Sequence, residues 1–334
     1  MAILVTGGAG YIGSHTVLFL LEQGEQVIVL DNLQKGHAGA LSDVTFYHGD
    51  IRDDQLLDTI FTTHSIDTVI HFAANSLVGE SVKQPIEYYE NNVIGTHTLL
   101  KKMLEHDVKK IVFSSTAATY GEPVQIPIQE SDPTIPTNPY GETKLAIEKM
   151  FHWCQEAYGL QYVCLRYFNA AGADPNGRIG EDHSPESHLI PIVLQVALGQ
   201  RERVAIFGDD YQTEDGSCIR DYIHVMDLAN AHYLACEHLR KDGQSGSFNL
   251  GNGKGFSVKE VIEVCRQVTG HPIPAEIAPR RSGDPASLIA SSEKAQTILG
   301  WEPKYPSLET MVEHAWNWHK EHPHGYSTEN KDKQ

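Results

Sequence analysis

The sequence predicts an α/β protein with a doubly wound parallel sheet and a smaller α/β lobe in its C-terminal part. Short apolar runs alternate with amphipathic helical patterns over residues 1–172. Strands separated by helices need crossover connections, which place the strands parallel. A glycine-rich turn also follows the first apolar run, where sheets of this kind bind phosphate groups.

The first half of the chain supplies the predicted sheet. The expected strands are Ile3–Thr6, Gln26–Leu30, Val44–His48, Thr68–Phe72, Lys110–Ser115 and Gln161–Arg166. The expected helices are Tyr11–Gln23, Asp53–Thr63, Tyr88–His106 and Pro139–Tyr158. The last helix has the strongest boundary signals, because Asn138 can cap its start, Pro139 suits its first turn and Gly159 suits its end.

After about residue 170 the pattern weakens, and loops rich in Gly, Pro, Asp and Asn dominate. Short helices are still expected, at Leu189–Leu198, Val225–Leu239, Ser257–Val268 and Ser307–Glu321. We therefore predict a first domain over residues 1–172, rejoined by part of 218–250. A second lobe follows over 173–320, and a polar, frayed tail over 321–334.

The charge balance excludes some partners. With 44 acidic and 26 basic side chains in 334 residues, the formal net charge is −18. Nucleic-acid binders and proteins that bind anionic membranes carry basic patches, so we expect neither partner. The chain has no apolar run of about 20 residues and no basic N-terminal leader, which predicts a cytoplasmic protein.

Cysteine and histidine spacing predicts neither a disulfide framework nor a metal site. The five cysteines are an odd number, are widely spaced and include no C-x-x-C pair. The 18 histidines include no H-E-x-x-H or similar arrangement. The cysteines are Cys154, Cys164, Cys218, Cys236 and Cys265.

The glycine-rich turn indicates a dinucleotide site in a Rossmann-like domain. Residues Thr6–Gly13 read T-G-G-A-G-Y-I-G, with glycines at positions 7, 10 and 13 between a strand and a helix. Such glycines let a pyrophosphate approach the backbone, and the helix N-terminus offers it free N–H groups. Asp31 ends the second strand, 18 residues beyond Gly13. A carboxylate there suits the ribose of NAD and repels the phosphate of NADP.

A tyrosine–lysine pair indicates acid–base chemistry. Tyr140 and Lys144 are four residues apart in the strongest predicted helix, so they share a face. A nearby ammonium should lower the pKa of Tyr140 and make it a base for a sugar hydroxyl. Thr116 ends the strand before this helix and could share the proton. By itself the Y-x-x-x-K spacing is common among surface pairs, so a catalytically silent NAD- or nucleotide-binding protein stays an alternative.

These motifs resemble the extended short-chain dehydrogenase/reductase family, and within it the enzymes that invert a sugar nucleotide at C4. The resemblance runs from Met1 to about His319. Its most diagnostic segments lie downstream of the glycine turn, in the lobe that would bind the sugar nucleotide. The matching segments are Thr6–Gly13, Asp50–Ile51, Phe72–Ala74, Asn91–Asn92, Ser114–Gly121, Tyr140–Lys144, Leu165–Gly172, Thr213–His224 and Arg280–Asp284.

The resemblance implies a role for each matching residue. Tyr140, Lys144 and Thr116 would carry the chemistry. NAD would contact Gly7, Gly10, Tyr11, Ile12, Gly13, Asp31, Asn32, Asp50, Ile51, Phe72, Ala73, Ala74, Ser76, Asn91, Lys144 and Phe168. The substrate would contact Thr116, Tyr140, Asn169, His188, Leu189, Ala205, Ile206, Phe207, Arg220, Arg281 and Asp284.

The implied activity is the reversible interconversion of UDP-glucose and UDP-galactose through a 4-keto sugar, a step of galactose metabolism. Hydride would pass to bound NAD and back. The family also implies a homodimer paired through the helices at 88–106 and 139–158.

Three positions depart from patterns within the family: Thr116 replaces a serine, Ser76 a lysine, and Leu288 a tyrosine or smaller residue that controls access for N-acetylated sugars. Another UDP-sugar, an N-acetylhexosamine or a glucuronate, stays an alternative substrate. A 4,6-dehydratase is disfavoured, because Ala117 and Ala118 follow Thr116 where that chemistry needs a carboxylate.

Overall fold

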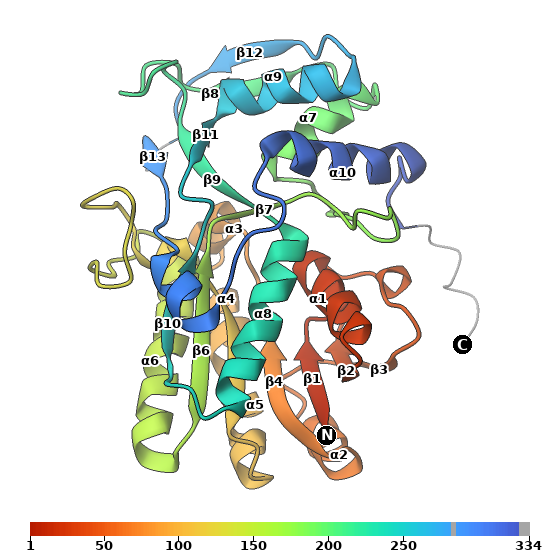
Figure 1. The fold of residues 1–334 in the computed structure, drawn as a ribbon, viewed down its shortest axis with the longest axis vertical. Helices are drawn as coiled ribbons and strands as arrows, with labels where there is room; N and C mark the ends of the chain where they lie inside the picture. The colour runs from red at the N-terminus through yellow and green to blue at the C-terminus, as the bar shows by residue number, and fades with distance from the viewer. Residues whose placement is uncertain (282–284, 327–334) are drawn as a thin grey trace.

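The structure is a computed structural model that describes residues 1–281 and 285–326, and it is built around a seven-stranded parallel sheet (Figure 1). The strand order is β10-β6-β5-β4-β1-β2-β3. The chain runs outward from β1 in one direction and then crosses to β4, so the order reverses between these two strands. Ligands bind outside the carboxyl ends of the strands at such a point. The predicted doubly wound parallel sheet is confirmed. The strands are β1 Ala2–Thr6, β2 Gln26–Asp31, β3 Thr45–His48, β4 Ile66–His71, β5 Lys110–Thr116, β6 Gln161–Tyr167 and β10 Gly246–Leu250.

Helices cover both faces of this sheet, so its strands are apolar on both sides. In β1, Ile3 and Val5 pack under α1 and α8, while Leu4 packs on the opposite side against α2, α5 and α6. No helix in the described part of the chain is long and apolar enough to cross a membrane. These helices are α1 Tyr11–Glu22, α2 Asp54–Thr63, α5 Gly95–Glu105, α6 Pro139–Tyr158 and α8 Val225–Arg240.

The segment before α5 differs from the predicted helix over Tyr88–His106. It contains α3 Val78–Lys83, then α4 Pro85–Tyr88, which runs into a π-helix at Tyr89–Ile94 and on into α5. Asn92, inside the π-helix, is buried and donates to the Asn75 carbonyl and to Thr143 Oγ1. A single π turn inside a helix frequently marks a functional site.

A smaller lobe lies beyond the carboxyl ends of the large sheet (Figure 1). Its central strand, β9, pairs with β7, β11 and β13, and β8 pairs with β12. The apolar core of the lobe joins α7, α9 and α10 to β8 and β9. The strands are β7 Asn169–Ala171, β8 Val204–Phe207, β9 Ile219–His224, β11 Gly255–Ser257, β12 Ala275–Ala278 and β13 Ser287–Leu288; the helices are α7 Leu189–Ala197, α9 Val258–Thr269 and α10 Leu308–Glu321.

The described end of the chain packs against the fold, although the sequence predicts a frayed tail from residue 321. Glu321 is the last residue of α10. The Tyr326 hydroxyl donates to the Gly180 carbonyl at 3.1 Å, and its ring centre lies 5.3 Å from that of Trp318. Aromatic burial therefore holds residues 322–326 in place. The rest of the predicted tail lies outside the described residues.

Candidate active site

The glycine turn leaves the start of α1 open. Gly7 has φ +73°, and a Cβ there would come within 2.5 Å of the Ala73 backbone nitrogen. Gly10 precedes the helix without a side-chain cap, and a Cβ on it would meet only the Gly7 carbonyl oxygen, at 3.4 Å. The N–H groups and the positive dipole end of this helix suit a pyrophosphate. The turn therefore fits the phosphates of a dinucleotide.

Asp31 closes the same turn. One carboxylate oxygen accepts from the Ala9 N–H at 2.9 Å, and the other from the Leu33 N–H at 2.8 Å. Burial raises the pKa of Asp31, and these two hydrogen bonds oppose that rise. A carboxylate has about four acceptor positions, so two backbone bonds leave room for ribose hydroxyls. The arrangement fits the role predicted for Asp31.

Asn32 and Asp50 lie together beyond β2 and β3. Asn32 Nδ2 donates to Asp50 at 3.1 Å, and Arg52 binds both Asp50 oxygens at 2.8 Å. The Arg52 guanidinium lowers the pKa of Asp50 to about 2, so this group is a carboxylate at neutral pH. The neighbouring Ile51 is buried. The polar contacts tie the residue after β2 to the loop after β3.

The remaining predicted cofactor residues follow β4, lie on the π-helix or follow β6. Backbone bonds from Phe72 and Ala73 to the Thr6 carbonyl tie the end of β4 to the turn. Asn91 Nδ2 donates to Asn92 Oδ1 at 3.0 Å within the π-helix. Ala74 is partly buried, whereas Ser76 is exposed in the loop that follows. Phe168 is partly buried between β6 and β7.

The three predicted catalytic residues meet at the carboxyl end of β5. Thr116, its last residue, lies close enough to Tyr140 in the first turn of α6 for its hydroxyl to lower the pKa of that tyrosine. Lys144 lies one turn further along α6, and its Nζ donates to the Ser114 carbonyl at 2.8 Å. This nitrogen lies 5.9 Å from the centre of the Tyr140 ring and 4.6 Å from that of Phe113.

The pKa predicted for Tyr140 is wrong in direction for the chain alone. Burial raises the pKa of Tyr140 to about 12, and the Thr116 hydrogen bond opposes the rise. Lys144 does not supply the expected lowering, since its nitrogen is directed to Ser114. Burial also lowers the pKa of Lys144 to about 7, so part of its charge is lost at neutral pH.

Several predicted substrate residues gather in the smaller lobe. Asn169 on β7 lies opposite Tyr222 in the parallel ladder between β7 and β9. His188 is the residue before α7, and Leu189 is its first residue. The N-terminus of α7 can therefore bind a phosphate, with a histidine beside it.

The two arginine positions lie on β9 and in the loop after β12. The Arg281 guanidinium lies 4.0 Å from the centre of the Phe207 ring. Phe207 belongs to β8 together with Ala205 and Ile206. Arg220 on β9 donates to the Ile219 carbonyl at 2.7 Å and to the Pro285 carbonyl at 3.0 Å. Leu288 on β13 is opposite Arg220 in the ladder. The last predicted residue, Asp284, lies outside the described residues.

Comparisons with known proteins agree with this arrangement. Residues 3–251 match the NAD dependent epimerase/dehydratase family. The chain belongs to this family. It is 57% identical to a UDP-glucose 4-epimerase of Lacticaseibacillus casei, over 99% of this chain and 100% of that one. A UDP-glucose 4-epimerase of Streptococcus mutans is 55% identical, over 98% of this chain and 99% of that one.

A solved structure supports the same relationship. The UDP-glucose 4-epimerase of Bifidobacterium longum, crystallised with NAD+ and UDP, superposes with a TM-score of 0.93. It is 44% identical, covering 98% of this chain and 100% of that one. The family includes dehydratases as well as epimerases. In this chain Ala117 and Ala118 directly follow Thr116. Methyl groups cannot transfer the proton that a dehydration requires.

Sequence reasoning missed a charged cluster before α7. Glu181 is buried and forms ion pairs with His183 at 3.2 Å and, more closely, with His188. His183 is also 3.7 Å from Glu186. Although burial opposes protonation, these glutamates raise the pKa of His183 to about 10, and Glu181 raises that of His188. The donor atoms of the four side chains lie within 4.8 Å of one another, which the ion pairs explain. Two histidines in the motif D-H-S-P-E-S-H were the available sequence signal.

Proposed function

We propose that the protein interconverts UDP-glucose and UDP-galactose by epimerisation at C4, using tightly bound NAD. The observation that carries this proposal is the set of Thr116, Tyr140 and Lys144 at the end of β5, beside the open start of α1. High identity to UDP-glucose 4-epimerases over nearly the full chain supports it.

The cofactor would be held by the glycine turn, by Asp31 and by the residues after β2, β3 and β4. The open α1 terminus and the remaining acceptor positions of Asp31 fit a dinucleotide. When bound, NAD supplies a hydride acceptor and donor together with a positive charge. Tyr140 stays the candidate base for the sugar.

Tyr140 takes the proton from the sugar O4 and later returns it. In the chain alone its pKa is about 12, so its phenolate needs stabilisation. The Thr116 hydroxyl lowers the pKa of Tyr140, and by donating a hydrogen bond it would stabilise the phenolate. Lys144 fixes the position of α6 against β5 through the Ser114 carbonyl. Correct placement of these groups supplies a large part of the rate.

Epimerisation also requires that the 4-keto sugar turn over before it is reduced again. The nucleotide must therefore be held firmly and the sugar loosely. The smaller lobe has suitable groups for the diphosphate and base, namely the α7 terminus with His188, Arg220, and Arg281 beside Phe207. Arginine binds phosphate with paired N–H groups.

A coupled assay tests the function. The purified protein is incubated with UDP-galactose without added NAD, and the reaction is stopped. The UDP-glucose formed is then measured in a separate step with UDP-glucose dehydrogenase and NAD. We expect conversion. Bound NAD without conversion would support the non-catalytic alternative, and formation of a stable 4-keto-6-deoxy sugar would support a dehydratase. Incubating the protein with UDP-N-acetylglucosamine or UDP-glucuronate and separating the products by chromatography tests substrate range. The bulk of Leu288 leads us to expect preference for the plain hexose.

We also propose a homodimer paired through the π-helix–α5 segment and α6. Both elements cover the same face of the sheet and expose large apolar side chains, with Trp153 exposed by 69% on α6 and Ile94 by 53% on the π-helix. Trp153→Asp should halve the mass measured in solution from twice 37.1 kDa, whereas Ile298→Asp, an exposed control, should not. A parent protein that is already monomeric would contradict the proposal.

The proposed compartment is the cytoplasm. All five cysteines are free thiols, and four of them are buried. Free thiols persist in reducing compartments, where disulfides are rare.

A further inference from the structure

The helix that carries Tyr140 and Lys144 carries a third buried polar residue, Glu148, one turn further along. Its carboxylate is surrounded by protein donors. Ser115 Oγ donates at 2.5 Å, Arg166 Nε at 3.0 Å, and a second Arg166 nitrogen binds the other oxygen. Glu148 and Arg166 are each only 6% exposed.

Three consecutive residues of β5 are thereby tied to three successive turns of α6. Ser114 accepts from Lys144, Ser115 donates to Glu148, and the Thr116 hydroxyl lies close enough to Tyr140 to lower its pKa. Residues four apart on a helix lie on one face. Glu148 therefore helps to fix the register between the strand and the helix that together form the catalytic site.

Arg166 extends the same contact to the other side of Thr116. Its NH1 group donates to the Tyr120 hydroxyl at 2.9 Å, and that hydroxyl donates to Asn249 Oδ1 at 2.7 Å. Tyr120 follows the short turn Ala117–Thr119 that begins after Thr116. The Glu148–Arg166 pair thus holds the chain one residue before Thr116 and four residues after it.

Stability alone does not account for this pair. Burying two charges costs several kcal/mol per ion, and an apolar pair of similar volume often serves a core equally well or better. Charged groups differ from apolar ones because they fix the directions of hydrogen bonds. The pair here directs bonds to Ser115, directly before the catalytic threonine, and to Tyr120, four residues after it.

We propose that Glu148, paired with Arg166, is a positioning residue for the reaction, holding Ser115 and Tyr120 so that the Thr116 hydroxyl stays within hydrogen-bond reach of Tyr140. This inference rests on the proposed function. Glu148 acts through other residues, because its oxygens are bound by Ser115 and Arg166 and not directed to the sugar.

The test compares kinetics of Glu148→Gln, of the apolar double variant Glu148→Met/Arg166→Met and of Ser115→Ala. We expect kcat to fall about 10²-fold in the first two and less in the third, while KM for UDP-galactose and NAD content stay within about threefold. The double variant leaves no unpaired buried charge, so it decides the matter if Glu148→Gln does not fold.

The pH profile separates positioning from mere loss of folded protein. Losing the Thr116 hydrogen bond raises the pKa of Tyr140, so the pH at which kcat rises should move upward in the variants. A smaller folded fraction would lower kcat at every pH without moving the pH at which kcat rises. Ser247→Ala, which removes a 3.4 Å contact to the same carboxylate, is the matched control and should resemble the parent.

Two results would overturn the proposal. One is a double variant with kcat within about threefold of the parent. The other is an unchanged pH at which kcat rises, with kcat falling only in proportion to the amount of folded protein. A parent protein that fails to convert UDP-galactose would instead overturn the proposed function.

Discussion

Lys144 donates from Nζ to the Ser114 carbonyl at 2.8 Å, across from the helix to the strand. This bond holds the ammonium at Ser114 in a buried setting, 5.9 Å from the centre of the Tyr140 ring. The lysine therefore carries a desolvation cost in the chain alone, and that cost can be measured.

Lys144→Met should raise the free energy of unfolding while lowering the catalytic activity. Burial lowers the pKa of Lys144 to about 7 from its usual 10.5, so the unfolded chain binds the proton more readily. Stability of the parent should therefore fall as the pH decreases from about 10.5 to 7. The variant should gain about 1–4 kcal/mol at and below pH 7, with the gain vanishing above about pH 10.5. Thermal unfolding across this range checks the prediction, and a variant less stable at pH 7 would contradict it.

Tyr140→Phe should remove the base while leaving the nucleotide-binding site intact. We expect kcat to fall by about 10²–10⁴-fold, the contribution of a positioned acid–base group, with UDP affinity nearly unchanged. Tyr158→Phe on the exposed end of the same helix is the control and should keep full activity. Steady-state kinetics with calorimetric UDP binding checks both variants. Near-normal turnover in the first would exclude Tyr140 as the base.

Gly10→Ala should fold normally but bind NAD poorly. Gly10 has φ −74°, which alanine accepts, and its Cβ would meet only the Gly7 oxygen at 3.4 Å. The added methyl would instead occupy space before α1, where we expect the pyrophosphate. NAD affinity should fall more than about tenfold, or about 1.4 kcal/mol. Calorimetry on NAD-stripped protein measures this.

Gly159→Ala is the control for Gly10→Ala and should show the opposite behaviour. Gly159 ends α6 at φ +71°, where an added Cβ meets no atom within 4 Å but the backbone is strained. It should lose about 1 kcal/mol of stability and keep its NAD affinity. If Gly10→Ala lost stability and retained NAD, the assignment of the turn to the cofactor would be wrong.

The elements that the sequence predicts well are those specified locally. The observed bounds of α6 match the prediction, because Asn138 caps the backbone N–H of Gly141 and Gly159 takes the left-handed conformation. The strands of the smaller lobe were not predicted. β7 has three residues and pairs with β9, some 50 residues later in the chain, so no periodic pattern could reveal it.

Candidate site residues show the same limit. Spacing places Tyr140 and Lys144 on one face of a helix, and the structure agrees. Spacing does not say where Nζ points, which depends on the Ser114 carbonyl of a strand 30 residues earlier. The pKa of Tyr140 was therefore predicted in the wrong direction. Glu148 lies on the same face, but its role depends on Arg166 from β6.

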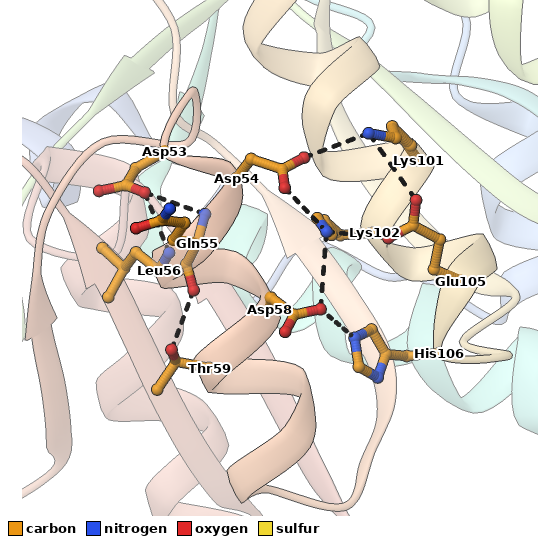
Figure 2. Close-up of polar contacts among 10 residues, drawn as sticks. All are labelled: Asp53, Asp54, Gln55, Leu56, Asp58, Thr59, Lys101, Lys102, Glu105 and His106. Atoms are coloured by element: carbon orange, nitrogen blue, oxygen red, sulfur yellow. Dashed lines mark hydrogen bonds and ion pairs between the residues drawn. The ribbon is translucent and has the colours of Figure 1, made fainter.

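A lysine far from the site gives a separate test of stability. Lys102 on α5 is 9% exposed and pairs with Asp54 and Glu105 at 2.9 Å and Asp58 at 3.5 Å (Figure 2). Its neighbour Lys101 is 54% exposed and pairs at 3.4 and 3.8 Å. Lys102→Met should lower the melting temperature at neutral pH, because three carboxylates lose their shared cation. Lys101→Met should change it little, as exposed pairs contribute little.

The pH dependence of this effect follows from the carboxylates. Lys102 lowers the pKa of Asp54, and His106 with Lys102 lowers that of Asp58. Groups with a lowered pKa stabilise the fold above their ordinary pKa and lose that contribution as the pH falls through the folded value. The gap in melting temperature between parent and Lys102→Met should therefore be full at neutral pH and close below about pH 4. A gap of equal size at both ends would show that Lys102 acts through the packing of its alkyl chain and not through its charge.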